Sequence, residues 1–216
     1  PFVLFVRPRE REREVWAGQR LGVEGARELT GAAEVYPISE MAQRLPELIA
    51  GASSIHYPVG LADEFDRIVR DLLVNSRRGR ARSGRGPSAL DDLDEVIGLL
   101  RRIKDPEEIE RIRTAARISI AGHAAAREAI HPGVGEWEVQ AVLEAQFRRL
   151  GASRPAFPSI VGSGPNATTL HYTANHRRIE EDDLVLIDAG AEWGLYCADM
   201  TRTIPASGRF TPPQQA

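Results

Sequence analysis

A mixed α/β (α+β) fold in two domains, residues 1–103 and 104–216, is what this sequence predicts. In the first half, short apolar stretches rich in β-branched and aromatic residues alternate with segments of helical spacing. Such alternation is typical of an α/β domain. In the second half, two long helical patterns precede a strand-rich segment that starts near residue 157. The length of 216 residues fits one large domain or two smaller ones.

The composition narrows the class of protein. Charged residues make up 27% and hydrophobic residues 42%, which argues against a disordered chain. A net charge of -3 gives no electrostatic case for a nucleic-acid partner. No apolar run approaches the roughly 20 residues that span a bilayer, so we expect no membrane partner. The single cysteine excludes an intrachain disulfide framework and favours a reducing compartment, the cytoplasm.

The first domain opens with an apolar run at residues 1–6 that predicts a buried strand. A short helix is indicated around residues 39–49, although Pro46 leaves its start open. Residues 54–59 form a second strand candidate, and apolar residues spaced by three and four over 65–73 predict an amphipathic helix.

A basic run follows at residues 77–85, where five arginines are interleaved with glycines. One interpretation is a patch for anions or nucleic acid. The other is a solvated surface loop, which we favour because no aromatic residues are interleaved for base stacking.

The second domain starts with clear helix signals. Asp105 is a suitable N-cap, Pro106 fits the first helical position, and two glutamates follow at the positive end of the helix dipole. We expect this helix to end at residues 131–133, and a second helix to begin at Gly135 and close near Gly151.

Two aspartates in the strand-rich segment carry the chemical argument. Asp188 ends the apolar run 184–187, which we expect to be a strand buried on both faces, and Asp199 lies inside a second strand candidate at 196–204. With Trp193 and Gly194 as a two-residue hairpin tip, the register places Asp188 directly opposite Asp199. Cross-strand neighbours have Cβ atoms about 4.5–5.5 Å apart.

Two ionised carboxylates at that distance need compensation, either by a raised pKa or by a cation. A pair of carboxylates can bridge two metal ions, and its oxygen ligands favour ions such as Mn²⁺. Alternatively, Asp188 caps a turn and Asp199 bonds locally to Thr201 or Arg202, with Arg202 as counter-ion. Cys197 shares strand parity with Asp199, and we interpret it as a small buried filler.

A histidine precedes this pair. The open loop around Gly162 and Gly164 leads to His171 after a short apolar stretch. A lone histidine is more often structural or on the surface than catalytic. The remaining histidines have no carboxylate partner that the sequence identifies, and we interpret them as structural: His56, His123, His131 and His176.

Three of these segments resemble the pita-bread metallopeptidases, a family that includes aminopeptidase P (Xaa-Pro aminopeptidase), prolidase and creatinase. They are residues 157–172, 187–190 and 198–203. The resemblance extends upstream through 104–108 and the two helices, while residues 4–16 are similar to the N-terminal domain of bacterial aminopeptidase P. The resemblance implies an N-terminal creatinase-like α/β domain whose start is missing, followed by the first half of a pita-bread catalytic domain.

The resemblance also implies a mechanism. Asp188 and Asp199 would be ligands of two divalent metal ions, with Asp199 bridging both; the ions would be Mn²⁺, with Co²⁺ or Zn²⁺ as alternatives. His171 would line the site and help to bind substrate or stabilise the tetrahedral intermediate. A metal-bridging hydroxide would attack the carbonyl before a proline, so the partners would be peptides with proline at the second position. The full-length parent would be a homo-oligomer.

One departure from the family pattern stands out. The family completes its metal site with one histidine and two glutamates further along the chain, and none can be assigned because the sequence ends thirteen residues after Thr203. We therefore expect an internal fragment that is inactive by itself and poorly soluble because of unpaired sheet edges. The alternatives are a prolidase or creatinase-type hydrolase and a non-catalytic, peptidase-like binding module.

Overall fold

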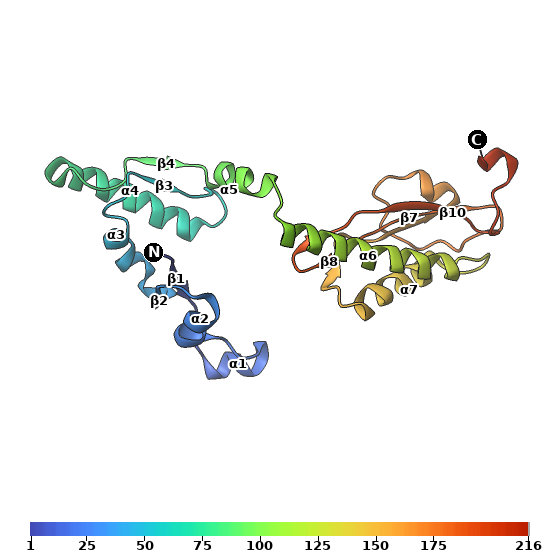
Figure 1. Ribbon diagram of the computed structural model, residues 1–216, viewed down its shortest axis with the longest axis horizontal. Coiled ribbons are helices and arrows are strands. Elements are labelled where there is room, and N and C mark those ends of the chain that lie inside the picture. The colour runs from blue at the N-terminus through green and yellow to red at the C-terminus, as the bar shows by residue number, and fades with distance from the viewer. Residues whose placement is uncertain (216) are drawn as a thin grey trace. The chain divides into compact units, whose positions relative to one another are not determined.

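The chain folds into two compact units, Pro1–Arg102 and Ile103–Ala216. They are seen in a computed structural model that describes residues 1–215 (Figure 1). Helices and strands alternate in the first unit, and two long helices precede a set of short strands in the second. Both patterns agree with the mixed α/β class that the sequence predicts.

The first unit begins with two parallel strands, β1 (Val3–Val6) and β2 (Glu34–Pro37). Parallel strands need a crossover connection, which here contains α1 (Arg11–Ala17) and α2 (Gly22–Thr30). Packing of α2 against the strand pair forms a small core. Its buried residues are Ala26, Ala32 and Val35, with Leu4, Val6 and Val23 partly buried around them.

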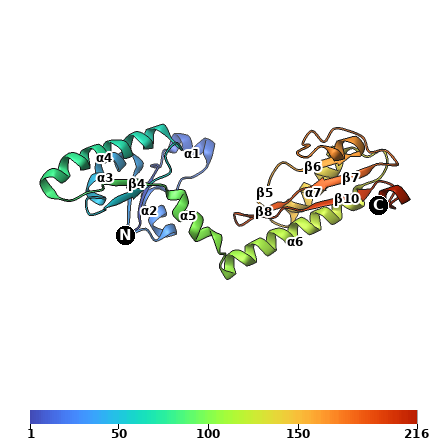
Figure 2. The same ribbon diagram turned by 90° about the horizontal axis from the view of Figure 1, so that it is seen from above.

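A second parallel pair, β3 (Ser54–His56) and β4 (Ala89–Asp91), is joined by the long helix α4 (Asp63–Ser83). Figures 1 and 2 show α4 lying along this pair. The remaining elements of the first unit are η1 (Ile38–Glu40), α3 (Met41–Leu48) and α5 (Leu93–Arg102). Pro46 lies inside α3, and α1, α2, β2, β4 and α5 were not foreseen from the sequence.

The loop interpretation of the basic run is wrong for most of its length. Residues 77–83 form the last turns of α4, and the helix ends at Gly84, whose φ of 67° is left-handed. The Gly84 amide donates to the Arg80 carbonyl oxygen at 2.9 Å. Arginine is a good helix former, and cations in a last turn interact favourably with the helix dipole, so the run continues the helix.

In the second unit, α6 (Pro106–Ala129) starts where the sequence predicts. Asp105 Oδ1 accepts a hydrogen bond from the Glu108 amide at 2.8 Å, and Glu108 Oε2 accepts one from the Asp105 amide at 2.8 Å. This reciprocal pair is a capping box. The second predicted helix is α7 (Glu136–Arg149), which packs beside α6.

Two antiparallel sheets follow the helices. The larger has the order β10-β7-β6 and the smaller the order β5-β8-β9. The strands of the larger sheet are β6 (Ile160–Ser163), β7 (Leu184–Asp188) and β10 (Thr201–Pro205). Those of the smaller are β5 (Arg154–Pro155), β8 (Ala191–Trp193) and β9 (Tyr196–Cys197). Short 3₁₀ helices are η2 (Gly164–Thr168) and η3 (Pro212–Gln215).

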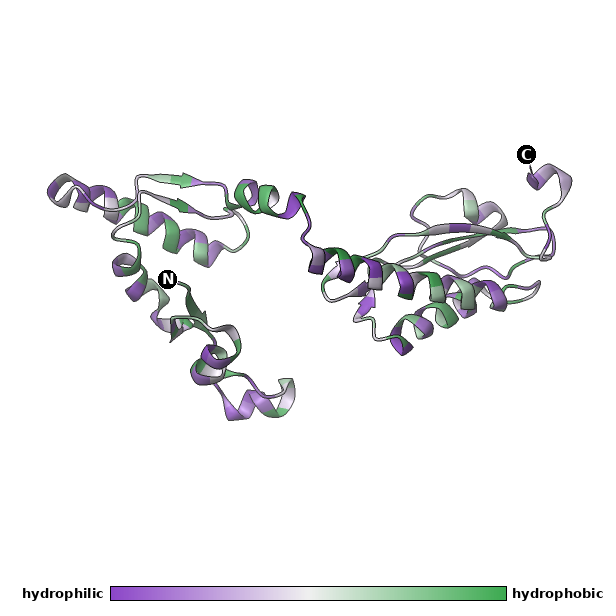
Figure 3. Ribbon diagram, viewed as in Figure 1, coloured by the Kyte–Doolittle hydropathy of each residue, from purple (hydrophilic) through white to green (hydrophobic). Residues whose placement is uncertain are grey.

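The central strand β7 is buried on one face only, contrary to the prediction. Val185 and Ile187 are fully buried, whereas Leu184 and Leu186 are half-buried. The reason is that α6 and α7 lie on a single face of the sheet (Figure 1), and both helices carry alternating hydrophobic and hydrophilic bands (Figure 3). The core between them includes Ile118, Val139, Leu143, Phe147, Val161, Val185 and Ile187.

The predicted hairpin register is also wrong, by two residues. Glu192 pairs with Cys197 and Trp193 with Tyr196, so the turn residues are Gly194 and Leu195, with φ of 57° and 70°. Trp193 stays in the strand because its side chain packs against the core. The predicted strand at 196–204 is interrupted between β9 and β10, and Asp188 lies opposite Thr201 instead of Asp199.

Candidate metal centre

Asp188 is the last residue of β7, the central strand of the larger sheet. Its backbone pairs with Ile160 on one side and Thr201 on the other. Its half-buried side chain accepts a hydrogen bond at Oδ1 from the Thr201 hydroxyl at 2.8 Å. The central strand therefore fixes the backbone of this aspartate from both sides, and Thr201 orients one of its two carboxylate oxygens.

Asp199 lies in the irregular segment between β9 and β10, and its carboxyl group meets that of Asp188. Partial burial, the charge of Asp188 and a hydrogen bond with Asp188 together raise the pKa of Asp199. The two-residue error in register did not separate the pair, because a shift of two residues keeps a side chain on the same face of a strand. The structure thus brings together the two aspartates that the sequence singled out.

The local alternatives fare differently. Arg202 is not the counter-ion of either aspartate, since its Nη1 donates to the Thr201 carbonyl oxygen at 2.7 Å. Thr201 does bond locally, but to Asp188 instead of Asp199. Two facing carboxylates, with the pKa of Asp199 raised by its neighbour, are a donor set that fits a hard or borderline divalent cation.

The described chain supplies two candidate metal ligands, Asp188 and Asp199, and not a full coordination sphere. Across residues 1–215, no three histidine, cysteine, aspartate or glutamate side chains gather closely enough to hold a metal ion. Structural metal sites are closed by about four ligands, and catalytic ones by at least three. Tight binding would therefore need further ligands.

Close backbone contacts hold the segment between the two aspartates. The Ala189 amide donates to the Met200 carbonyl oxygen at 3.1 Å, and the Ala198 amide donates to that of Ala191 at 3.1 Å. At Gly190, a Cβ atom would lie 1.6 Å from the Ala198 carbonyl oxygen. Only glycine fits there, so the approach of the two chain segments depends on this residue.

Two buried polar residues of α6 bind the same segment, a role that was not predicted from the sequence. The Ala191 amide donates to Ser119 Oγ at 2.9 Å, and His123 Nε2 lies 3.0 Å from the Ala189 carbonyl oxygen. They are four residues apart, so they share a helix face. This spacing on an otherwise apolar face is the signal that could have identified them as anchors.

His171 lies in the turn after η2 and is exposed. No hydrogen bond of the described residues joins its imidazole to either aspartate. The segment around it is nonetheless well ordered by contacts of its neighbours, because the Tyr172 hydroxyl donates to Glu136 Oε2 at 2.8 Å. The structure therefore places His171 on a fixed segment without showing a direct contact to the carboxylate pair.

Cys197 is exposed on β9, so its interpretation as a buried filler is wrong. Its neighbours explain the difference. The strand β9 has only two residues and lies at the edge of the smaller sheet, so only β8 pairs with it.

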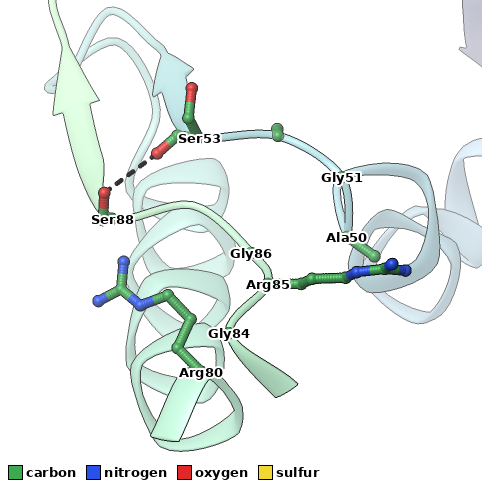
Figure 4. Close-up of a pocket in the computed structure, with 9 residues that line it drawn as sticks. Ala50, Gly51, Ser53, Arg80, Gly84, Arg85, Gly86 and Ser88 are labelled. Carbon is green, nitrogen blue, oxygen red and sulfur yellow. Dashed lines mark hydrogen bonds between the residues drawn. The ribbon is translucent and has the colours of Figure 1, made fainter.

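A hollow of about 510 Å³ in the first unit collects part of the basic run. Arg80 and Arg85 line it, together with Ser53 and Ser88. In Figure 4 the two arginine side chains point away from each other, and Ser88 donates to the Ser53 carbonyl oxygen at 3.3 Å. The arginines do not converge on one point, so the hollow gives no support to an anion site.

No helix within residues 1–215 is both long and apolar enough to cross a membrane.

Comparison with family models gives two matches. Residues 110–216 match metallopeptidase family M24, and residues 1–56 match the N-terminal domain of aminopeptidase P. The aminopeptidase P match covers part of the first unit, and the M24 match covers most of the second.

Curated relatives point the same way. The chain is 38% identical to Xaa-Pro aminopeptidase of Escherichia coli over 99% of its own length and 48% of the relative. It is 35% identical to Xaa-Pro aminopeptidase of Haemophilus influenzae, covering 99% and 47%. A mitochondrial relative, intermediate cleaving peptidase 55 of Arabidopsis thaliana, is 33% identical, covering 93% and 39%. The chain thus spans about half the length of the curated relatives it matches.

Solved structures share the fold as well. The aminopeptidase PepP of Pseudomonas aeruginosa superposes with a TM-score of 0.89 at 41% identity, covering 99% of this chain and 48% of that one. A variant of Escherichia coli aminopeptidase P in complex with substrate superposes with a TM-score of 0.90 at 37% identity, covering 99% and 48%.

Proposed function

We propose that the chain is part of a metal-dependent aminopeptidase, because residues 110–216 belong to metallopeptidase family M24 and residues 1–56 carry the N-terminal domain of aminopeptidase P. Its substrates are peptides with proline at the second position, and it cleaves the bond before that proline. The observation that carries the proposal is the contact between the Asp188 and Asp199 carboxyl groups.

In this proposal, Asp188 and Asp199 would hold a pair of divalent ions. When bound, the ions supply Lewis-acid polarisation of the scissile carbonyl and an activated water. Manganese suits the oxygen ligands, with cobalt or zinc as alternatives. Because two carboxylates do not complete such a site, one histidine and two glutamates from the rest of the full-length protein provide the other ligands.

The other residues of the site act on the substrate and on the backbone. His171 is exposed and free to donate a hydrogen bond to the oxygen on which negative charge develops during carbonyl attack. Ser119 and His123 keep the 189–191 segment in place, and with it the separation between the two carboxylates. Thr201 holds one oxygen of Asp188.

We also propose the setting in which this site works. Residues 1–103 are a creatinase-like domain whose start lies upstream, and residues 104–216 are the first half of the catalytic domain. The full-length protein is a homo-oligomer in the cytoplasm, and the single cysteine supports a reducing compartment.

The test is Asp199→Asn in the full-length protein. We expect turnover of an Xaa-Pro-Yaa tripeptide to be lost while folding is retained, because the amide removes a ligand charge without changing volume. Asp182→Asn, at an exposed aspartate of the same unit, is the matched control and should keep wild-type turnover. Wild-type activity of Asp199→Asn would remove Asp199 from the metal site.

A substrate panel separates the rival activities. Cleavage of the tripeptide alone supports the aminopeptidase, cleavage of an Xaa-Pro dipeptide alone a prolidase, and turnover of creatine a creatinase. A peptidase-like binding module would bind proline peptides in calorimetry and cleave none of them with any of the three metals.

A further inference from the structure

Glu136, the first residue of α7, has a side chain that is completely buried and accepts hydrogen bonds from five donors. Its Oε1 accepts from the Ser163 amide and the Ser163 hydroxyl, both at 2.7 Å, and from Asn166 Nδ2 at 3.2 Å. Its Oε2 accepts from the Tyr172 hydroxyl at 2.8 Å and the Arg177 amide at 2.9 Å. A buried carboxylate with this many donors is an anchor for whatever carries the donors.

The donors flank His171 on both sides in the sequence. Ser163 and Asn166 precede it, whereas Tyr172 and Arg177 follow it. One carboxylate therefore closes residues 163–177 into a loop, and the exposed imidazole of His171 projects from that loop.

The carboxylate is ionised in this setting. Burial opposes its ionisation, but the hydrogen bonds from Arg177, Ser163 and Tyr172 outweigh burial and lower the pKa of Glu136. Hydrogen bonds to a charged acceptor are roughly twice as strong as neutral ones. The negative charge is thus what makes the loop closure firm.

A second ring of contacts ties the donors to one another. Asn166 Nδ2 donates to the Tyr172 hydroxyl at 2.8 Å, and Arg177 Nη1 donates to Ser163 Oγ at 2.9 Å. The Glu136 amide in turn donates to the Arg177 carbonyl oxygen at 3.0 Å. These bonds make the loop and the start of α7 a single network.

We propose that Glu136 is a positioning residue: its buried carboxylate fixes the loop 163–177 and thereby holds His171 where the substrate is bound. The role in catalysis rests on the proposed function, whereas the anchoring of the loop does not. Glu136 itself touches neither substrate nor metal; it acts through His171.

The anchoring is tested on the chain itself by hydrogen exchange. Glu136→Gln keeps the size of the side chain but removes its charge. Its amide group cannot accept from the donors on its side, whether these are Ser163 and Asn166 or Tyr172 and the Arg177 amide. We expect the amides of Ser163 and Arg177 to exchange at least about tenfold faster, since 1.4 kcal/mol corresponds to a factor of ten. Unchanged exchange at both amides would overturn the anchoring.

Glu138→Gln is the matched control. Glu138 lies two residues further along the same helix, and its Oε2 accepts from the Gly135 amide at 2.7 Å and lies 3.8 Å from Arg178 Nη1, just outside residues 163–177. We expect its effect to be confined to the helix start and Arg178. Equal acceleration of the loop amides by the two variants would mean that the helix end, and not the carboxylate of Glu136, protects the loop.

The catalytic role is tested by a double-mutant cycle in the full-length protein. Glu136→Gln should lower kcat by about 10–100-fold with a smaller change in KM, because a misplacement of about 1 Å can cost 100-fold in rate. In a His171→Ala background, Glu136→Gln should cause no further loss, since the residue acts through the imidazole. Losses that multiply would overturn the positioning role.

The two measurements also separate this inference from the proposed function. Absence of tripeptide turnover in the wild-type full-length protein overturns both the proposed function and the catalytic role of Glu136. The exchange of the Ser163 and Arg177 amides would still decide whether the carboxylate anchors the loop. If the full-length protein turns over the tripeptide and the kcat losses of the two substitutions multiply, the proposed function stands and the positioning role of Glu136 is rejected.

Discussion

Gly190 lies where two backbone segments approach closely, next to the contact between Asp188 and Asp199. The Ala198 carbonyl oxygen lies where any Cβ at residue 190 would be, and it belongs to the backbone. The same segment carries the carboxylate contact and the two anchors from α6. A single position thus couples local packing to the geometry of the candidate metal site.

Gly190→Ala should therefore destabilise the chain by about 1–3 kcal/mol or more, the usual cost of forcing extra atoms into a packed site. Urea unfolding measures the loss. Gly98→Ala in α5 is the control, because nothing lies within 4 Å of its added Cβ, and alanine in a helix should be neutral or stabilise by up to about 1 kcal/mol. Equal stability of the two variants would contradict the close approach.

The pair of carboxylates predicts a pH dependence of the metal-free chain. Because the pKa of Asp199 is raised in the folded state, the folded chain keeps the carboxyl proton over a pH range in which the unfolded chain has lost it. Stability should then fall as the pH rises from about 4, the ordinary aspartate value, through the raised pKa. Asp199→Asn removes this fall, so its free energy of unfolding should exceed the wild-type value at pH 7 and match it near pH 3. A wild-type advantage at pH 7 would contradict the repulsion.

At the residue level, the sequence was sufficient to find the aspartate pair but not its supports. Asp188 and Asp199 stand out because Asp188 ends an apolar run and the predicted hairpin places Asp199 opposite it on one face. Ser119, His123 and Glu136 are polar residues on helices, and a sequence pattern does not show which of them are turned inward and bonded to distant backbone. Their partners lie 27 to 72 residues away in the chain.

Among the elements, α6 shows that local sequence signals can predict where a helix begins. Its start at Pro106 was predicted from Asp105 and the glutamates that follow, and the capping box is present. By contrast, α1 and α5 contain no buried residue, and all three residues of β4 are exposed. Such elements leave no pattern of burial in the sequence, so they were not foreseen.

Asp105→Ala tests the cap of α6. Removing the side-chain acceptor should cost about 1 kcal/mol, the typical value for an N-cap, and should be seen as a lower urea midpoint in circular dichroism. Asp105→Asn keeps the acceptor and should lose only a few tenths of that. An alanine variant as stable as the asparagine variant would mean that the capping box adds nothing.

On the scale of the whole chain, the two units differ in the size of their cores. The first unit buries Ala26, Ala32 and Val35 in its cluster, whereas the second buries several large side chains, including Leu143 and Phe147. Stability grows with buried apolar area. We expect the first unit to lose its amide protection at a lower urea concentration than the second.

Leu143→Ala probes the separation of the two units. The side chain of Leu143 is completely buried, so its truncation should cost about 2–5 kcal/mol. Hydrogen exchange should show the loss within residues 103–215 and leave residues 1–102 unchanged. An equal loss of protection in both units would show that they unfold together.

The exposure of Cys197 has a practical consequence. It is the single cysteine of the chain and lies two residues before Asp199. A nitroxide attached to this thiol needs no engineered cysteine and sits close to the carboxylate pair. Mn²⁺ and Co²⁺ are paramagnetic and would broaden its spectrum on binding, whereas Zn²⁺ is diamagnetic and would not. The natural thiol thus offers a spectroscopic report on which ion the aspartates take up.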